Sequence, residues 1–199
     1  YVGGIQVLYE AINGQIKSYL LIAESIAIPL NILMLLFVFG AAVAAGLPMV
    51  VALGSIAGSF FALYIITQFT DVSVFALNLI TGLGLGLGID YALLIVNRFR
   101  EELTRTNDVN ASVIKTVTTA GRTVFFSGLT VALVLASMIL FPQYFLKSFA
   151  YAGVSVVLFA VFASLIALPA TLALLGHKVD KWKIRRGDLS PKESGAWSK

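Results

Sequence analysis

Asp90 and Tyr91 are the residues of this sequence whose types and position best suit proton chemistry. They lie in a long apolar segment, and Asp90 precedes the charged residue Arg98 by a helical rise of roughly 12 Å. That rise places the carboxyl group in the inner part of a membrane's hydrocarbon layer. An aspartate at such a depth costs roughly 2.5 to 3.5 kcal/mol to insert, so it should face a helix bundle or a water-filled path and bind a proton readily. A carboxyl group that gains and loses a proton can couple proton passage to helix movement.

Tyr91 cannot share a helix face with Asp90, because adjacent helical residues point about 100° apart. We therefore expect Tyr91 to serve a carboxylate on another helix. Ser127 and Thr130 lie three residues apart in a later apolar segment and could donate hydrogen bonds to Asp90. Serine and threonine also pack at membrane helix interfaces and bond to their own backbone carbonyls, so an ordinary packing role is the alternative for this pair. The corresponding alternative for Asp90 and Tyr91 is a hydrogen-bond acceptor and a packing aromatic.

Glycine occupies every second position of the segment before Asp90. The four residues are Gly82, Gly84, Gly86 and Gly88. They form two pairs at i, i+4 spacing, so two helix faces lack side chains and can accept tightly packed neighbours or let the helix bend. Asp90 follows Gly86 on one of these faces.

The composition requires a membrane as the main solvent. Of the 199 residues, 59% are hydrophobic and 12% are charged, with a mean hydropathy of +0.94. The apolar residues gather in runs of about 20 or more, long enough to cross a hydrocarbon layer of roughly 30 Å. We therefore expect an all-α integral membrane protein whose membrane domain, residues 24–176, is a bundle of five transmembrane helices. The expected spans are 24–45, 47–69, 74–97, 123–141 and 149–175.

The segments outside the spans differ in polarity. Residues 1–23 mix polar and apolar positions, which indicates the end of an outer region and an amphipathic approach to the membrane. Within the polar connection 99–120, valines recur at i+4 spacing and predict a short amphipathic cytoplasmic helix along the membrane surface. The basic tail, residues 177–199, is too polar to bury a core and is expected to be disordered.

Basic residues predict the orientation. All of the 14 lysines and arginines except Lys17 and Lys147 lie in residues 98–122 and 178–199. Two spans separate these regions, so both face the same side, which the positive-inside rule assigns to the cytoplasm. We expect a multi-pass protein of the inner membrane with its N-terminus outside and its C-terminus in the cytoplasm. A chain that begins on the outer side is typical of a piece of a larger protein.

Several kinds of chemistry are disfavoured. The sequence has no cysteine, which excludes disulfides and thiolate metal sites. Its single histidine, His177, follows the last apolar run, whereas a metal site needs several convergent donors. The spans offer no histidine, no glutamate beyond Glu24 and one aspartate, which argues against an intramembrane hydrolase. We expect no enzyme activity, no metal, no cofactor and no nucleic-acid partner.

The segment 84–102, GLGLGIDYALLIVNRFREE, resembles the MmpL transporters, the mycobacterial membrane protein large family of the resistance-nodulation-division superfamily. Segments 23–29 and 119–130 add to the resemblance, which covers about residues 8–176. It implies that the five spans are helices two to six of the first half of such a transporter, whose outer porter domain contributes most of the substrate choice.

This resemblance also implies an activity and partners. The activity is proton-motive-force-driven export of lipids, glycolipids or siderophores, so membrane lipids and a hydrophobic substrate are expected partners. A second half with its own Asp-Tyr pair would complete the relay of which Asp90 and Tyr91 are one half. Assembly from two copies of the chain is the alternative way to complete it.

A lipid-binding or regulatory module is the second functional hypothesis. Sterol-sensing domains have a related five-helix arrangement, although the tandem Asp90-Tyr91 favours the pump. In a sensing module, lipid binding would survive Asp90→Asn and would depend on the glycine-lined groove, which Gly86→Leu should fill.

Overall fold

The structure, a computed structural model, describes residues 5–180, which are helical almost throughout and contain no strand. Four stretches of helix in this range are long and apolar enough to cross a membrane, as expected from the runs of apolar residues. These stretches are Ala42–Thr67, Phe75–Thr106, Val109–Leu140 and Tyr144–Val179. The expected all-α membrane fold is therefore confirmed. Residues 1–4 and most of the basic tail, residues 181–199, lie outside the described range.

Helix α1 (Ile5–Phe39) covers most of the first expected span and the approach before it. Its apolar part, Ser25–Phe37, is shorter than a membrane span. The first expected span, residues 24–45, therefore remains a prediction. The contacts divide the chain after Val38, and the described residues from 39 onward form a unit that we call the bundle.

The break between the first two helices falls at Gly40, earlier than the boundary expected at residues 45–47. Gly40 has φ +60°, a left-handed conformation that glycine adopts without the steric penalty of a Cβ atom. Pro48, the second residue of the expected span 47–69, lies inside α2 instead, where it is buried. Glycine at a position that needs positive φ therefore ends the helix, while the proline is accommodated within the next one.

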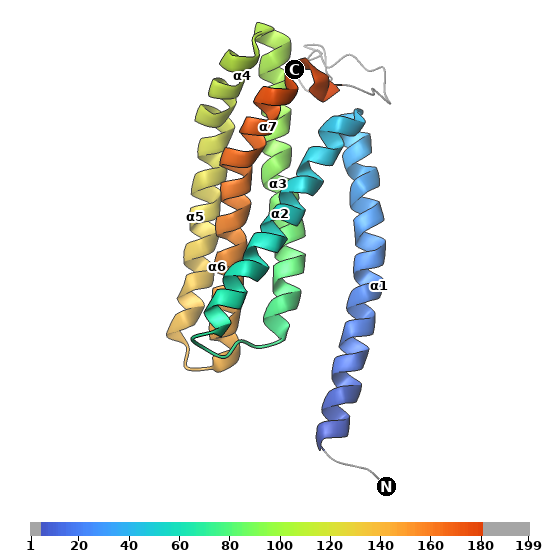
Figure 1. Cartoon of the computed structure of the whole chain (residues 1–199), viewed down its shortest axis with the longest axis vertical. Helices are drawn as coiled ribbons and strands as arrows, with labels where there is room; N and C mark the ends of the chain where they lie inside the picture. The colour runs from blue at the N-terminus through green and yellow to red at the C-terminus, as the bar shows by residue number, and fades with distance from the viewer. Residues whose placement is uncertain (1–4, 181–199) are drawn as a thin grey trace, which may run out of the picture. The chain divides into compact units, whose positions relative to one another are not determined.

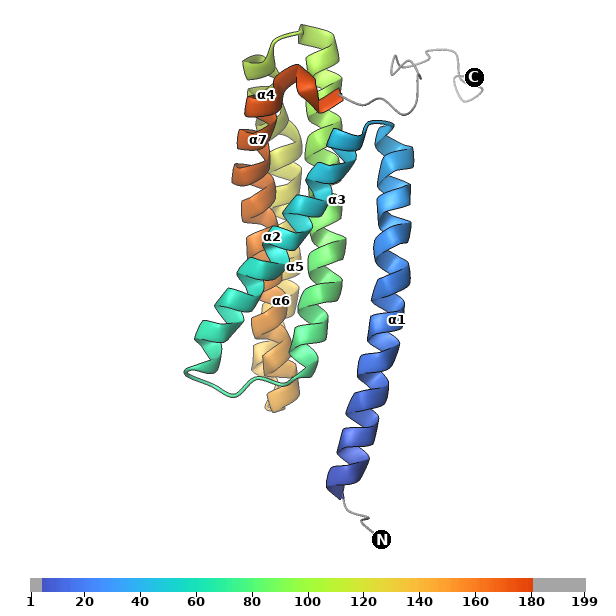
Figure 2. The same ribbon diagram turned by 45° about the vertical axis from the view of Figure 1, so that its right-hand side comes forward.

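Four long helices form the bundle, and Figures 1 and 2 show them side by side. They are α2 (Ala42–Thr67), α3 (Phe75–Thr106), α5 (Arg122–Ala136) and α6 (Tyr144–Phe162). Helix α3 packs against both α2 and α6, and α5 packs against α6. The core where α2, α3 and α6 meet contains Leu63, Ala76, Ile80, Ala152 and Val156.

The polar connection after α3 forms a short helix, α4 (Val109–Thr116), at the same end of the bundle as α7 (Leu168–Leu175) (Figure 1). Asp108 caps α4, because its Oδ1 accepts hydrogen bonds from the backbone N–H groups of Asn110 (2.8 Å) and Ala111 (3.2 Å). The short helix expected here is present, but it runs through a π-helical turn, η1 (Val117–Gly121), directly into α5. It therefore continues the span rather than lying apart along the membrane surface.

Between α5 and residue 180, where the described range ends, the chain contains three short helical turns. These are η2 (Ser137–Leu140), the π-helical η3 (Ala163–Ala167) between α6 and α7, and η4 (Gly176–Asp180). The two π-helical turns pack together, since a Cβ on Gly121 would lie 3.2 Å from Leu165 Cδ2. His177 lies in η4 and is exposed.

The charged end of α3 is held by a cluster of ion pairs. At about 1.5 Å per residue, α3 is longer than a hydrocarbon layer of about 30 Å, so its last turns lie beyond that layer. Glu102 is paired there with Arg98 (Oε1–Nη2 2.6 Å) and with Arg105 (Oε2–Nη2 2.8 Å), and its side chain is 3% exposed. The hydrogen bond from Arg105, with the charges of its neighbours, holds the pKa of Glu102 below its ordinary value despite burial, which raises it.

Glu102→Gln is expected to lower the thermal unfolding temperature more than Glu101→Gln does. Glu101 is 65% exposed and makes one ion pair, with Arg98, whereas Glu102 is buried between two guanidinium groups. A carboxyl group with a lowered folded-state pKa adds stability above its unfolded pKa and loses it as pH falls through the folded value. Circular dichroism melts in detergent should therefore show the Glu102→Gln deficit near neutral pH and a smaller deficit in acid. Equal melting temperatures for the two variants at neutral pH would contradict this role.

Candidate functional site

Asp90 and Tyr91 lie in contrasting environments on α3. The Asp90 side chain is exposed and forms no hydrogen bond or ion pair with any residue in the described range 5–180. Tyr91 is 4% exposed, and its hydroxyl is buried without a hydrogen-bond partner among the same residues. The Tyr91 Oη lies 3.7 Å from the position that a Cβ on Gly128 of α5 would occupy. The carboxyl group thus faces out of the bundle, and the hydroxyl faces into it.

One of the two glycine pairs of α3, Gly84 with Gly88, faces α2. A Cβ on Gly88 would lie 2.6 Å from Ala52 Cα, and a Cβ on Gly84 would lie 2.5 Å from Ile56 Cγ1. Helix α2 crosses α3 obliquely in both views (Figures 1 and 2), and Gly88 allows the two backbones to approach at the crossing. This pair is therefore required for packing inside the bundle.

The other glycine pair, Gly82 with Gly86, lies on the open face of α3. A Cβ at either position would meet no atom within 4 Å. Asp90 follows on the same face one turn after Gly86, and it is also exposed. An open strip without side chains therefore leads to the carboxyl group, and another helix backbone has room to approach it.

Ser127 and Thr130 lie on α5 and are exposed. Thr130 Oγ1 donates a hydrogen bond to the Phe126 carbonyl (2.9 Å), which is the ordinary backbone role of a threonine in a membrane helix. With Arg122, whose guanidinium lies 5.7 Å from the Phe126 ring centroid, they line a shallow pocket of about 560 Å³. Neither hydroxyl bonds to Asp90 in the described structure, so relay support from this pair remains a prediction.

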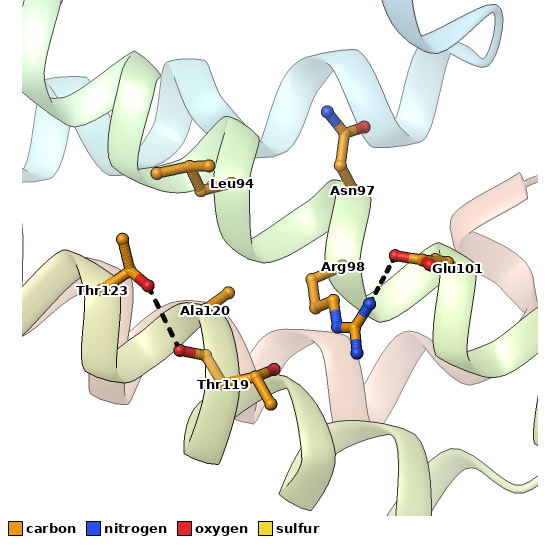
Figure 3. Close-up of a pocket in the computed structure, with 7 residues that line it drawn as sticks. All are labelled: Leu94, Asn97, Arg98, Glu101, Thr119, Ala120 and Thr123. Carbon is orange, nitrogen blue, oxygen red and sulfur yellow. Dashed lines mark hydrogen bonds and ion pairs between the residues drawn. The ribbon is translucent and has the colours of Figure 1, made fainter. Parts of the chain in front are cut away.

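A second pocket, of about 410 Å³, lies between α3 on one side and η1 with the first turn of α5 on the other, and we call it the α3–α5 pocket (Figure 3). Its lining residues are Leu94, Asn97, Arg98, Glu101, Thr119, Ala120 and Thr123. Sequence reasoning did not identify this pocket. A helical signal was present, because Asp90, Leu94, Asn97 and Glu101 follow one another at spacings of four, three and four residues. The facing threonines come from a separate segment, and only the fold brings them there.

The chemistry available at this site is proton transfer through side chains. Within residues 5–180, no group of three or more His, Cys, Asp or Glu residues could hold a metal ion. An outward-facing carboxyl group and an inward-facing phenol offer two titratable oxygens, each needing a partner that the described residues do not supply. A carboxyl group and a phenol are side chains through which a proton could pass if a partner or water reached them.

Comparison with known proteins places these residues in a family. The model of the MMPL family matches residues 1–198. The chain is 44% identical over 98% of its length to the Streptomyces coelicolor membrane protein SCO6666, covering 27% of that protein. It is 41% identical over 92% of its length to the trehalose monomycolate exporter MmpL3 of Mycobacterium tuberculosis, and the match covers 20% of that protein. It is 32% identical over 89% of its length to the membrane protein YdfJ of Bacillus subtilis, and this match covers 25% of YdfJ.

The chain thus spans about a quarter of the length of these curated relatives or less. The matches cover α3 with its glycines and Asp90-Tyr91, and they extend over nearly all of the chain at identities above 30%. Together with four apolar spans, they indicate a multi-pass membrane protein. The chain belongs to the MMPL family.

Proposed function

We propose that the chain forms part of a proton-motive-force-driven exporter of lipids or other hydrophobic envelope components, with Asp90 and Tyr91 as half of its proton relay. The observation that carries the proposal is the position of Asp90, a carboxyl group on an open face of an apolar span with no partner among the described residues. An isolated aspartate there is costly, which favours a functional partner. The MmpL3 relatives are trehalose monomycolate exporters, which supports a lipid as the transported substrate.

The partner that completes the relay is a second transporter half with its own Asp-Tyr pair, or a second copy of this chain. The open strip beside Gly82 and Gly86 supports this proposal, because a helix backbone can approach Asp90 along it. The buried Tyr91 hydroxyl, unpaired within residues 5–180, supplies a donor for a carboxylate that reaches it. Asp90 and Tyr91 face different directions and would therefore serve different partner groups.

We further propose that the end of the bundle carrying α4 and α7 faces the cytoplasm of the inner membrane. Five basic residues lie between positions 98 and 122, at this end, and they support the orientation through the positive-inside rule. The N-terminus then lies outside and the C-terminus inside.

The proposal is tested by following labelled lipid across liposomes that contain the protein at its natural length. Export should require an imposed pH gradient and should stop when a protonophore collapses it. Equal rates with and without the gradient would exclude proton coupling. Lipid binding without any transport, unchanged in Asp90→Asn, would instead support the lipid-binding module.

Tyr91→Phe is expected to preserve or raise the stability of the chain while lowering its export rate. Removing the Tyr91 hydroxyl breaks no hydrogen bond to any residue of the range 5–180, and burying an unpaired hydroxyl costs roughly 1–3 kcal/mol. Export should fall because the relay loses its phenolic proton donor. Tyr64→Phe, which removes an exposed hydroxyl from α2, serves as the control and should change neither property. A Tyr91→Phe protein that exports at the wild-type rate would show that this hydroxyl is not part of the relay.

A further inference from the structure

The α3–α5 pocket starts one helical turn from Asp90. Leu94 follows Asp90 by four residues on the same exposed face, a rise of about 6 Å, and Asn97 and Glu101 continue that face toward the charged end. Figure 3 shows Leu94 at the same end of the pocket as Thr123 and the Arg98–Glu101 ion pair (2.7 Å) at the other. Leu94 is thus the apolar side chain between the carboxyl group and the polar part of the pocket.

The polar part of the pocket suits water. The Asn97 side chain is exposed and has no hydrogen-bond partner among the described residues, so its carbonyl and amide groups are free for solvent. Thr119 and Thr123 donate their hydroxyls to backbone carbonyls of their own helix, which leaves the oxygens as acceptors. A water molecule occupies about 30 Å³ in the liquid and needs two to four polar partners, so about 410 Å³ holds several.

We propose that the α3–α5 pocket is the port through which Asp90 exchanges its proton with the aqueous phase at the charged end of the bundle, with Leu94 as the barrier between them. This inference rests on the relay role proposed for Asp90. The O–H bond of the protonated carboxyl breaks, a water that has passed Leu94 takes the proton, and Asp90 is left as a carboxylate. The proton then moves through waters bonded to Asn97 and leaves beside Arg98 and Glu101, and uptake is the reverse.

Leu94→Asn tests the barrier, with Leu129→Asn as a matched control. The two leucines are almost equally exposed, 45% and 44%, but Leu129 lies on α5 and lines neither pocket. The protein at its natural length is placed in liposomes that enclose a pH-sensitive dye, and the decay of an imposed pH gradient is followed without lipid substrate. Leu94→Asn should speed the decay about tenfold, the change given by lowering a barrier by about 1.4 kcal/mol. In liposomes with the Leu129→Asn protein, the pH gradient should decay at the wild-type rate.

Two further variants locate the route. Adding Asp90→Asn to Leu94→Asn should return the leak to the wild-type level, because the carboxyl group would no longer pass the proton on. Asn97→Leu, a substitution at an exposed position, should slow gradient-driven lipid export several-fold by displacing water from the pocket.

The outcomes separate this proposal from the relay role of Asp90. A folded Leu94→Asn protein without a leak, or a leak that persists in the double variant, would overturn the port. If Leu94→Asn does not fold, an Asn97→Leu protein that exports at the wild-type rate would overturn it. Export that continues in Asp90→Asn alone would overturn the relay role instead.

Discussion

Asp90→Asn is expected to abolish lipid export while the protein still inserts and folds. Asparagine nearly preserves the shape of aspartate but carries no titrating proton. Within residues 5–180 the Asp90 side chain makes no hydrogen bond or ion pair that the substitution could break. Export should fall by at least about a hundredfold, the lower end of what a positioned proton-transfer group contributes to a rate.

The measurement combines export with stability. Gradient-driven lipid export is followed in liposomes, and the thermal unfolding of the same preparation is followed by circular dichroism. Asp71→Asn is the control, because Asp71 is also exposed but lies in the loop between α2 and α3, at the opposite end of the bundle from α4. It should leave both properties unchanged. Wild-type export by Asp90→Asn would remove this residue from the relay, and unfolding of the variant would assign it a structural role.

Gly88→Ala should destabilise the bundle, whereas Gly86→Ala should not. The new Cβ at position 88 would lie 2.6 Å from Ala52 Cα and 3.2 Å from Ala52 N, both backbone atoms, so relief requires α2 and α3 to separate. Overpacking of this kind costs roughly 1–3 kcal/mol. A Cβ at position 86 meets nothing within 4 Å, and alanine in place of a helical glycine gains about 0.5–1 kcal/mol.

The two alanine variants form a matched pair, since the same methyl group is added to one helix two residues apart. Thermal unfolding should show a lower melting temperature for Gly88→Ala and an equal or higher one for Gly86→Ala. Equal effects at the two positions would contradict the close crossing of α2 and α3 at Gly88.

Helical periodicity accounts for what could be predicted about the site. A rotation of 100° per residue separates Asp90 from Tyr91 and groups the glycines into two pairs before any neighbour is known. Periodicity cannot say which pair meets which helix. That Gly84 and Gly88 pack against α2 while Gly82 and Gly86 stay open depends on how α2 crosses α3, which is a property of the whole bundle.

The helix boundary at Gly40 and the α3–α5 pocket are harder to predict than the apolar spans, because both depend on the folded bundle. The four apolar spans of the bundle could be predicted, because the length of each apolar run can be compared with the thickness of a membrane from the sequence alone. The break lies at Gly40 and not at the predicted residues 45–47, because Gly40 adopts positive φ while α2 accommodates Pro48. The α3–α5 pocket could not be predicted because Asn97 and Thr123 belong to segments that meet only after α3 has packed against η1 at the start of the α5 span.

Infrared difference spectroscopy of the carboxylic acid C=O stretch tests most directly whether Asp90 takes up and releases a proton. The protein at its natural length is studied in lipid bilayers as the pH of the surrounding solution is changed, and the Asp90→Asn variant is compared under the same conditions. A titrating group at Asp90 predicts a C=O band that rises and falls with pH in the wild-type protein and is missing from the variant. A set of titrating bands that is identical in the two proteins would contradict a proton relay through Asp90.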